Sequence, residues 1–266
     1  MNLEIVSNNL ALLLYGLALI YQGICFYRSI NARKNLLIAL CGAGAALHLL
    51  GALSLIYSEF GVNLRLYLSS SLVLAVTGLI LTFSSLRKPA ENLFLVLLPF
   101  SIVSLLVSLY APMTTEASGS YTTGMTIHIL LSICAYGVFI LANANALLLW
   151  WENWQLRHKR AMGRARTLPP IETLENLLFE FIWAGELLLT AAIASGFLVF
   201  DSLFEQQLLH KTVFGLIAWI IYAVLLIGRH ILGWRGVRAV TLSLFGFFAL
   251  VLAYTGTKVV VELILQ

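Results

Sequence analysis

Three of the five histidines in this 266-residue sequence lie within or at the ends of long apolar segments. His48 lies inside one segment, His128 lies near the start of another, and His210 opens a third. An ionisable side chain in such a segment is costly and marks a candidate functional site. Because a neutral imidazole ligates metals and haem iron well, the three histidines predict a site of this kind.

The same histidines also have simpler explanations. His48 and His128 could each donate a hydrogen bond to a carbonyl of a neighbouring helix. His210 could anchor its segment at the membrane surface beside Lys211. The sequence contains no HExxH motif, phosphate-binding loop, GxSxG motif or nucleotide fingerprint. We therefore expect no catalytic residues and no enzyme activity.

The composition defines an all-α integral membrane protein. Hydrophobic residues make up 61% of the chain, charged residues 11%, and the mean hydropathy is +0.94. Apolar runs long enough to cross a bilayer must be helical, because lipid cannot satisfy backbone hydrogen bonds. One polytopic domain is expected over residues 1–266, with no sizeable soluble domain. The predicted spans are about 3–27, 36–57, 66–86, 91–110, 125–150, 174–200, 209–230 and 239–262.

The basic residues predict the orientation of the chain. Most of the 16 lysines and arginines fall in one set of loops, and only Arg65, Lys211 and Lys258 lie on the opposite side. The positive-inside rule then places both termini outside a bacterial inner membrane, with a basic surface loop around Trp154–Thr167. Nucleic acid is not an expected partner, because no aromatic-interleaved basic surface accompanies this charge.

Other polar side chains within the predicted spans include Glu186, Asn143 and Asn145. Glu186, near the middle of its span, could be a proton-relay carboxylate or a protonated acid bonded to a helix. Interhelical hydrogen bonds would explain Asn143 and Asn145.

The small-residue run "CGAGAALHLLGA" around His48 predicts close helix packing. The scattered cysteines Cys25, Cys41 and Cys134 are expected to be packing residues.

Four segments carry a resemblance to a known family: "IHILLSICAYGVFILANANALLL", "LPPIETLENLLFEFIWAGELLLTAAIASG", "LLHKTVFGLIAWIIYAVLLIGRHILGWRG" and "RAVTLSLFGFFALVLAYTGTKVVVE". With them the chain resembles the cytochrome c assembly superfamily of haem-handling membrane proteins, of the CcsA/CcmC type. Within that superfamily it looks most like the YpjD/HemX-type inner membrane proteins. The resemblance implies that His128 is the haem-ligating histidine before the tryptophan-rich loop.

The chain departs from the assembly proteins in that loop and in two further histidines. The segment "FLVFDSLFEQQLLHK" contains no tryptophan, so the WWD signature of haem presentation is absent. The second outer histidine is replaced in "AYTGTK", and His230 is out of register with the intramembrane one. His48, His128 and His210 match the pattern of the YpjD/HemX-like subgroup. Relative depth favours pairing His128 with His210, whereas burial favours pairing His128 with His48.

The resemblance implies a non-catalytic, haem-binding membrane protein with an accessory or regulatory role in haem or cytochrome biogenesis. Haem b is the expected cofactor, ligated by His128 and His210, and a second membrane protein is a further candidate partner. The alternative is a cofactor-free membrane accessory subunit or a transporter-like module, in which Glu186 is the working residue.

Overall fold

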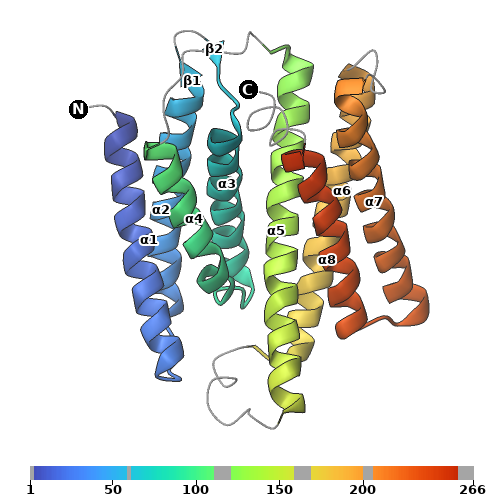
Figure 1. Cartoon of the computed structure of the whole chain (residues 1–266). Helices are drawn as coiled ribbons and strands as arrows, with labels where there is room; N and C mark the ends of the chain where they lie inside the picture. The colour runs from blue at the N-terminus through green and yellow to red at the C-terminus, as the bar shows by residue number, and fades with distance from the viewer. Residues whose placement is uncertain (1–2, 59–60, 111–120, 159–168, 200–205, 257–266) are drawn as a thin grey trace. The chain divides into compact units, whose positions relative to one another are not determined.

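The computed structural model describes residues 3–58, 61–110, 121–158, 169–199 and 206–256. Within this part of the chain, eight helices are long and apolar enough to cross a membrane, which confirms the all-α class (Figure 1). The helices are α1 (Leu3–Tyr27), α2 (Lys34–Ile56), α3 (Leu66–Arg87), α4 (Leu93–Tyr110), α5 (Thr123–Arg157), α6 (Ile171–Val199), α7 (Gln206–Leu232) and α8 (Val237–Val251).

Helix α5 extends furthest beyond its expected bounds, whereas α8 ends at Val251 and the last residues of its predicted span, 239–262, lie outside the described residues. Helix α5 continues to Arg157, seven residues beyond the predicted span, so the expected surface loop is helical at its start. No Gly or Pro interrupts the chain between Ala144 and Arg157, and Asn153 Nδ2 donates to the Leu149 carbonyl at 3.0 Å. The remainder of that loop, residues 159–168, lies outside the described residues. At the other end of the chain, a short π-helix (Leu252–Gly256) follows α8.

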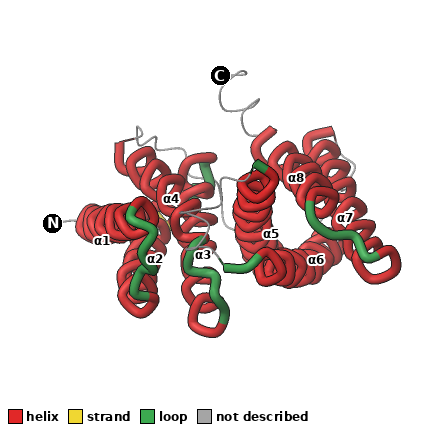
Figure 2. Tube along the Cα trace, turned by 90° about the horizontal axis from the view of Figure 1, so that it is seen from below, coloured by secondary structure: helices red, strands yellow, loops and turns green. Residues whose placement is uncertain are grey.

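The helices belong to two compact units. Unit 1 contains α1 to α4, and unit 2 contains α5, up to Trp154, with α6 to α8. The single polytopic domain expected over residues 1–266 stays a prediction. In unit 1, α1 packs against α2 and α4, and α3 packs between α2 and α4, which closes a four-helix ring (Figure 2). The two-residue strands β1 (Tyr57–Ser58) and β2 (Gly61–Val62) pair antiparallel after α2.

Small residues let the helices of unit 1 approach closely, as the run around His48 predicts. A Cβ atom at Gly44 would lie 2.8 Å from Cε1 of Tyr15 on α1, and one at Gly42 would lie 2.9 Å from Cγ2 of Thr82 on α3. The small residues of α2 therefore face both neighbouring helices. This close packing holds the tyrosine ring of α1 against the helix that carries His48.

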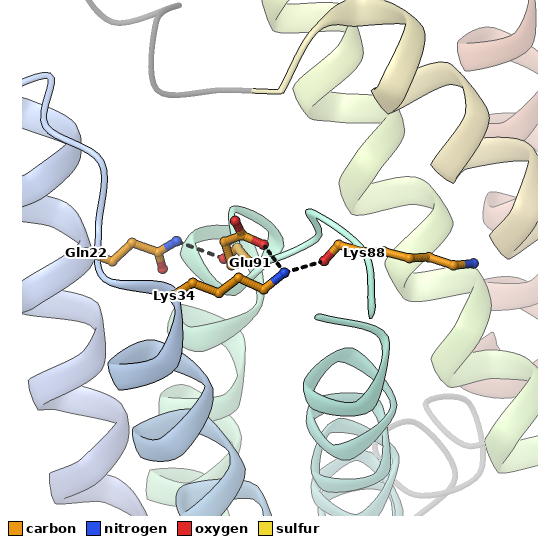
Figure 3. A network of polar contacts seen from close by, with 4 residues as sticks. All are labelled: Gln22, Lys34, Lys88 and Glu91. Carbon is orange, nitrogen blue, oxygen red and sulfur yellow. Dashed lines mark hydrogen bonds and ion pairs between the residues drawn. The ribbon is translucent and has the colours of Figure 1, made fainter. Parts of the chain in front are cut away.

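A polar clasp, made of Gln22, Lys34, Lys88 and Glu91, closes one end of unit 1 (Figure 3). The Gln22 amide donates to the Glu91 carbonyl at 2.9 Å, and Lys34 Nζ donates to the Lys88 carbonyl at 3.2 Å. Lys34 Nζ also lies 3.9 Å from Glu91 Oε2. The first two basic loops therefore lie at the same end of this bundle, as the charge pattern predicts.

Unit 2 is a second ring of four helices. Helix α7 packs against α6 and α8. Helix α5 reaches α6 through the Asn145 amide, which donates to the Leu174 carbonyl at 2.6 Å. It reaches α8 through Ser243, whose hydroxyl donates to Asn143 Oδ1 at 3.1 Å. The interhelical bonding expected for the two asparagines is thus confirmed.

We predict that Gly44→Ala destabilises the protein, because its methyl group would overlap the Tyr15 ring. Overpacking of this kind costs about 1–3 kcal/mol, so thermal unfolding in detergent should occur several degrees lower. The matched control is Gly16→Ala, where a Cβ atom meets nothing within 4 Å. An equal effect of both substitutions would contradict the packing described for unit 1.

Candidate functional site

His48 lies in the centre of unit 1 and is completely buried. Its Nε2 atom is 2.8 Å from the hydroxyl of Ser71 on α3, and its Nδ1 atom is 3.5 Å from the hydroxyl of Tyr15 on α1. The Tyr15 and His48 rings meet edge to face, with centroids 5.9 Å apart. Both ring nitrogens are therefore engaged by protein hydroxyls, in place of the helix carbonyl that the sequence suggested. Its role as a haem ligand stays a prediction.

His128 lies in unit 2, near the start of α5, and is half-buried. Its Nδ1 atom is 2.9 Å from the carbonyl oxygen of Ala192 and 3.1 Å from the hydroxyl of Ser195, both on α6. Because a carbonyl oxygen only accepts, Nδ1 carries the proton. In the neutral ring Nε2 then holds the lone pair. The sequence offered a bond to a neighbouring helix carbonyl as the simpler explanation of His128, and this bond is present.

Gly196 makes room for the His128 imidazole. A Cβ atom at Gly196 would lie 3.2 Å from His128 Cε1 and 3.4 Å from Nδ1, so the ring packs directly on the α6 backbone. Farther along α5, the Ser132 hydroxyl donates to the His128 carbonyl at 2.8 Å. Helix α6 therefore fixes the position of the imidazole by contact and its tautomer by a hydrogen bond.

His210 lies in the same unit as His128. It occupies the second turn of α7, since that helix begins at Gln206, and it is exposed. The first turns of α5 and α7 lie at the same end of unit 2 (Figure 1). His128 is roughly 8 Å into its helix and His210 roughly 6 Å into its own, at 1.5 Å per residue. The two histidines thus lie at similar depths, as the sequence indicates, whereas His48 belongs to unit 1.

A buried polar network lies deeper in unit 2. The Asn143 amide donates to the hydroxyl of Tyr222 at 3.1 Å, and that hydroxyl donates to the Ser243 carbonyl at 3.1 Å. Tyr222 is completely buried and stacks on Phe139, with ring centroids 4.1 Å apart. Three helices, α5, α7 and α8, are joined by this network. The sequence predicted the asparagine but gave no signal for its partners, because the pairing depends on helix packing.

Glu186 lies on α6 of unit 2, near Tyr222, and is 7% exposed. Its neighbour in sequence, Gly185, packs on the Phe139 ring, where a Cβ atom would lie 2.9 Å from the ring carbons. Neither carboxyl oxygen of Glu186 has a hydrogen-bond partner among the described residues. The sequence offered a protonated acid bonded to a helix as one explanation, and the structure shows no such bond.

Within the described ranges, no group of three or more His, Cys, Asp or Glu side chains could hold a metal ion. At the end of unit 2 where α5 and α7 begin, the described histidines are one oriented imidazole, His128, and the exposed His210. One or two imidazoles suit a haem iron, whose other ligands come from the porphyrin. They do not suit a structural zinc site, which needs four protein ligands.

Eight membrane-length helices in two bundles, with oriented histidines inside them, define a polytopic helical membrane protein. The family model described as "Cytochrome C assembly protein" matches residues 37–265. The chain belongs to this family. The resemblance seen in the sequence is therefore confirmed.

Two relatives are similar over most of the chain. The inner membrane protein YpjD of Escherichia coli K12 is 32% identical over 206 residues, which cover 77% of this chain and 78% of YpjD. An Azospirillum brasilense protein, described as an uncharacterized 28.8 kDa protein in the nifR3-like 5′ region, is 28% identical over 211 residues, with 74% and 76% covered. The chain is a multi-pass inner membrane protein, as predicted.

The likeness to the cytochrome c biogenesis proteins themselves is shorter. The cytochrome c biogenesis protein CcsA of Prochlorococcus marinus NATL1A is 33% identical over 89 residues, or 33% of this chain and 28% of CcsA. No solved structure matches the chain. The similarity to YpjD thus extends over more than twice as much of the chain as the similarity to CcsA.

We predict that Tyr222→Phe destabilises unit 2, because it leaves the buried Asn143 amide and Ser243 carbonyl without their shared partner. The Asn143 amide keeps its bond to the Phe139 carbonyl at 2.8 Å, so the expected loss is that of the hydrogen bonds of the Tyr222 hydroxyl, about 0.5–1.5 kcal/mol each. Thermal unfolding of the purified protein in detergent measures the loss. Tyr110→Phe is the control, since that side chain is 82% exposed. Equal stability of the two variants would show that the network contributes nothing.

Proposed function

We propose that this chain binds haem b through His128 in unit 2. Membership of a cytochrome c assembly family supports a relation to haem. The observation that carries the proposal is the bond from His128 Nδ1 to the Ala192 carbonyl, at 2.9 Å. Metal-ligating histidines commonly donate their second ring nitrogen to a carbonyl or carboxylate, which fixes the tautomer and the ring orientation. His128 has this arrangement before any iron is bound.

His210 is the proposed second ligand. It lies in the same unit as His128, on the helix that starts at the same end, and at a similar depth. Two imidazole nitrogens on opposite sides of one iron stand roughly 4 Å apart, at about 2 Å per bond. His48 is the weaker candidate, because hydroxyl groups of Ser71 and Tyr15 engage both of its nitrogens.

The protein groups around His128 would position the ligand and tune it. The Ala192 carbonyl and the Ser195 hydroxyl hold Nδ1, which makes Nε2 the nitrogen that ligates. Hydrogen bonding at Nδ1 also raises the basicity of the imidazole. Gly196 keeps the α6 backbone close to the ring. Bound haem would supply an iron centre that takes up and releases one electron.

We infer an accessory or regulatory role in haem or cytochrome biogenesis rather than catalysis. The segment that connects α6 and α7 has no tryptophan, so it lacks the WWD signature of haem presentation. No motif for hydrolysis or group transfer accompanies the histidines. We propose that a second membrane protein either receives the haem from this chain or responds to haem binding by this chain.

Haem titration of the detergent-purified protein tests the proposal. The parent should give a low-spin Soret spectrum, and His128→Ala should lose it, with affinity at least about tenfold lower. His210→Ala should convert the iron to a high-spin form, because one ligand is lost. His48→Ala should keep the parent spectrum.

His230→Ala is the matched control for a histidine substitution, since that side chain is exposed at the far end of α7. If the His128, His210 and His48 variants all bind haem as the parent does, the histidines are packing residues. A parent protein that stays colourless with added haem would favour the cofactor-free accessory subunit or transporter-like module.

We also propose that both termini lie outside, with the basic loops in the cytoplasm. The polar clasp supports this, since two of those loops meet at one end of unit 1. A reporter fused after Leu168 should read cytoplasmic, and one fused at the C-terminus should read external. The reverse pattern would place the histidines of unit 2 on the cytoplasmic side and contradict the proposed orientation.

A further inference from the structure

We propose that Glu186 is a proton-binding site at the centre of unit 2. The proton adds to a carboxylate oxygen of Glu186, which changes the charge of this side chain from −1 to 0. This site is separate from the histidine site and does not depend on whether haem binds. It rests on the position of the carboxyl group, on its burial and on the polar side chains around it.

The position of Glu186 is the first observation. It lies fifteen residues from the start of α6 at Ile171 and thirteen from its end at Val199. At 1.5 Å per residue, these are roughly 22 Å and 20 Å along the helix axis. The carboxyl group is therefore near the middle of a membrane-length helix, as far from either surface as this helix allows.

The absence of a compensating charge is the second observation. Glu186 is 7% exposed, and neither of its oxygens has a hydrogen-bond partner among the described residues. Over the same residues it forms no ion pair with any lysine, arginine or histidine. An isolated carboxylate in an apolar interior is strongly disfavoured and takes up a proton instead.

The helices around Glu186 present neutral polar groups. Helix α7 contributes Tyr222, whose hydroxyl interacts electrostatically with Glu186. It also contributes Trp219, whose indole donates at 2.9 Å to Thr190, which lies one turn after Glu186 on α6. Helix α5 contributes Asn143 and Tyr136, both of which interact with the Tyr222 hydroxyl. The titratable groups that face the site are thus tyrosines, which are neutral at ordinary pH.

This environment favours a proton over a metal cation. The oxygens of Asn143 and Tyr222 already accept hydrogen bonds, from Ser243 and Asn143 respectively. Of the described side chains Glu186, Asn143 and Tyr222, only the carboxyl group of Glu186 has no hydrogen bond, whereas a bare cation needs several oxygen ligands. A single proton satisfies the charge with no further ligand.

Infrared spectroscopy of the full-length protein in detergent at neutral pH tests the proposal. A protonated carboxyl group gives a carbonyl stretching band separate from that of carboxylate, and the band shifts when the protein is moved into D₂O. We expect this band in the parent and a lower intensity in Glu186→Gln, because the contribution of Glu186 is then absent; this substitution keeps the size of the side chain. Glu186→Asp should retain the band at a shifted frequency, which guards against misfolding of a single variant.

Glu152→Gln and Glu180→Gln are the matched controls. Glu152 is also buried, with one unpartnered oxygen, whereas Glu180 is exposed on the same helix as Glu186. The Glu186-dependent band should be present in both controls. A parent without the band, or a Glu186→Gln variant whose band keeps the full intensity of the parent, would overturn the proposal. A band that disappears on addition of sodium chloride, but not of an equally concentrated choline salt, would instead indicate a sodium site.

Discussion

The structure depends on one constraint: inside a bilayer, a polar group must find its partner within the protein. In each four-helix unit, a set of buried polar side chains finds such partners. In unit 1, His48 lies between the hydroxyls of Tyr15 and Ser71. In unit 2, the Asn143 amide, the Tyr222 hydroxyl and Ser243 satisfy one another across three helices. Polar contacts therefore select the neighbours of each helix, since apolar surface alone does not distinguish a helix from lipid.

His128 and Glu186 of unit 2 differ from the side chains in these hydrogen-bond networks. The His128 imidazole donates through Nδ1 to the Ala192 carbonyl on α6, at a half-buried position near the helix end. The Glu186 carboxyl is buried without a hydrogen bond among the described residues. The arrangement of His128 suits the proposed ligation of haem iron, and that of Glu186 suits the binding of a proton.

The elements of the fold could be predicted from the sequence because membrane helices have a fixed length and an apolar composition. Helix α5 was underestimated, since its last turns are polar and hydropathy does not report a helix that leaves the lipid. The depth of His128 and His210 could be predicted from their distance to the helix ends. The contacts of His128 with Ala192 and of His48 with Tyr15 could not, because they depend on which helices are neighbours and on how each helix is rotated.

Identification of the nitrogen that binds iron tests the account most directly. The haem-loaded parent, with histidine labelled with nitrogen-15, can be compared with His128→Gly by electron paramagnetic resonance of the ferric iron. The proposal predicts coupling to two histidine nitrogens in the parent, loss of one of them in His128→Gly while that of His210 remains, and restoration of the low-spin signal by added imidazole. A labelled-histidine coupling of unchanged strength in His128→Gly, or no haem uptake by the parent, would contradict the assignment of His128 as the axial ligand.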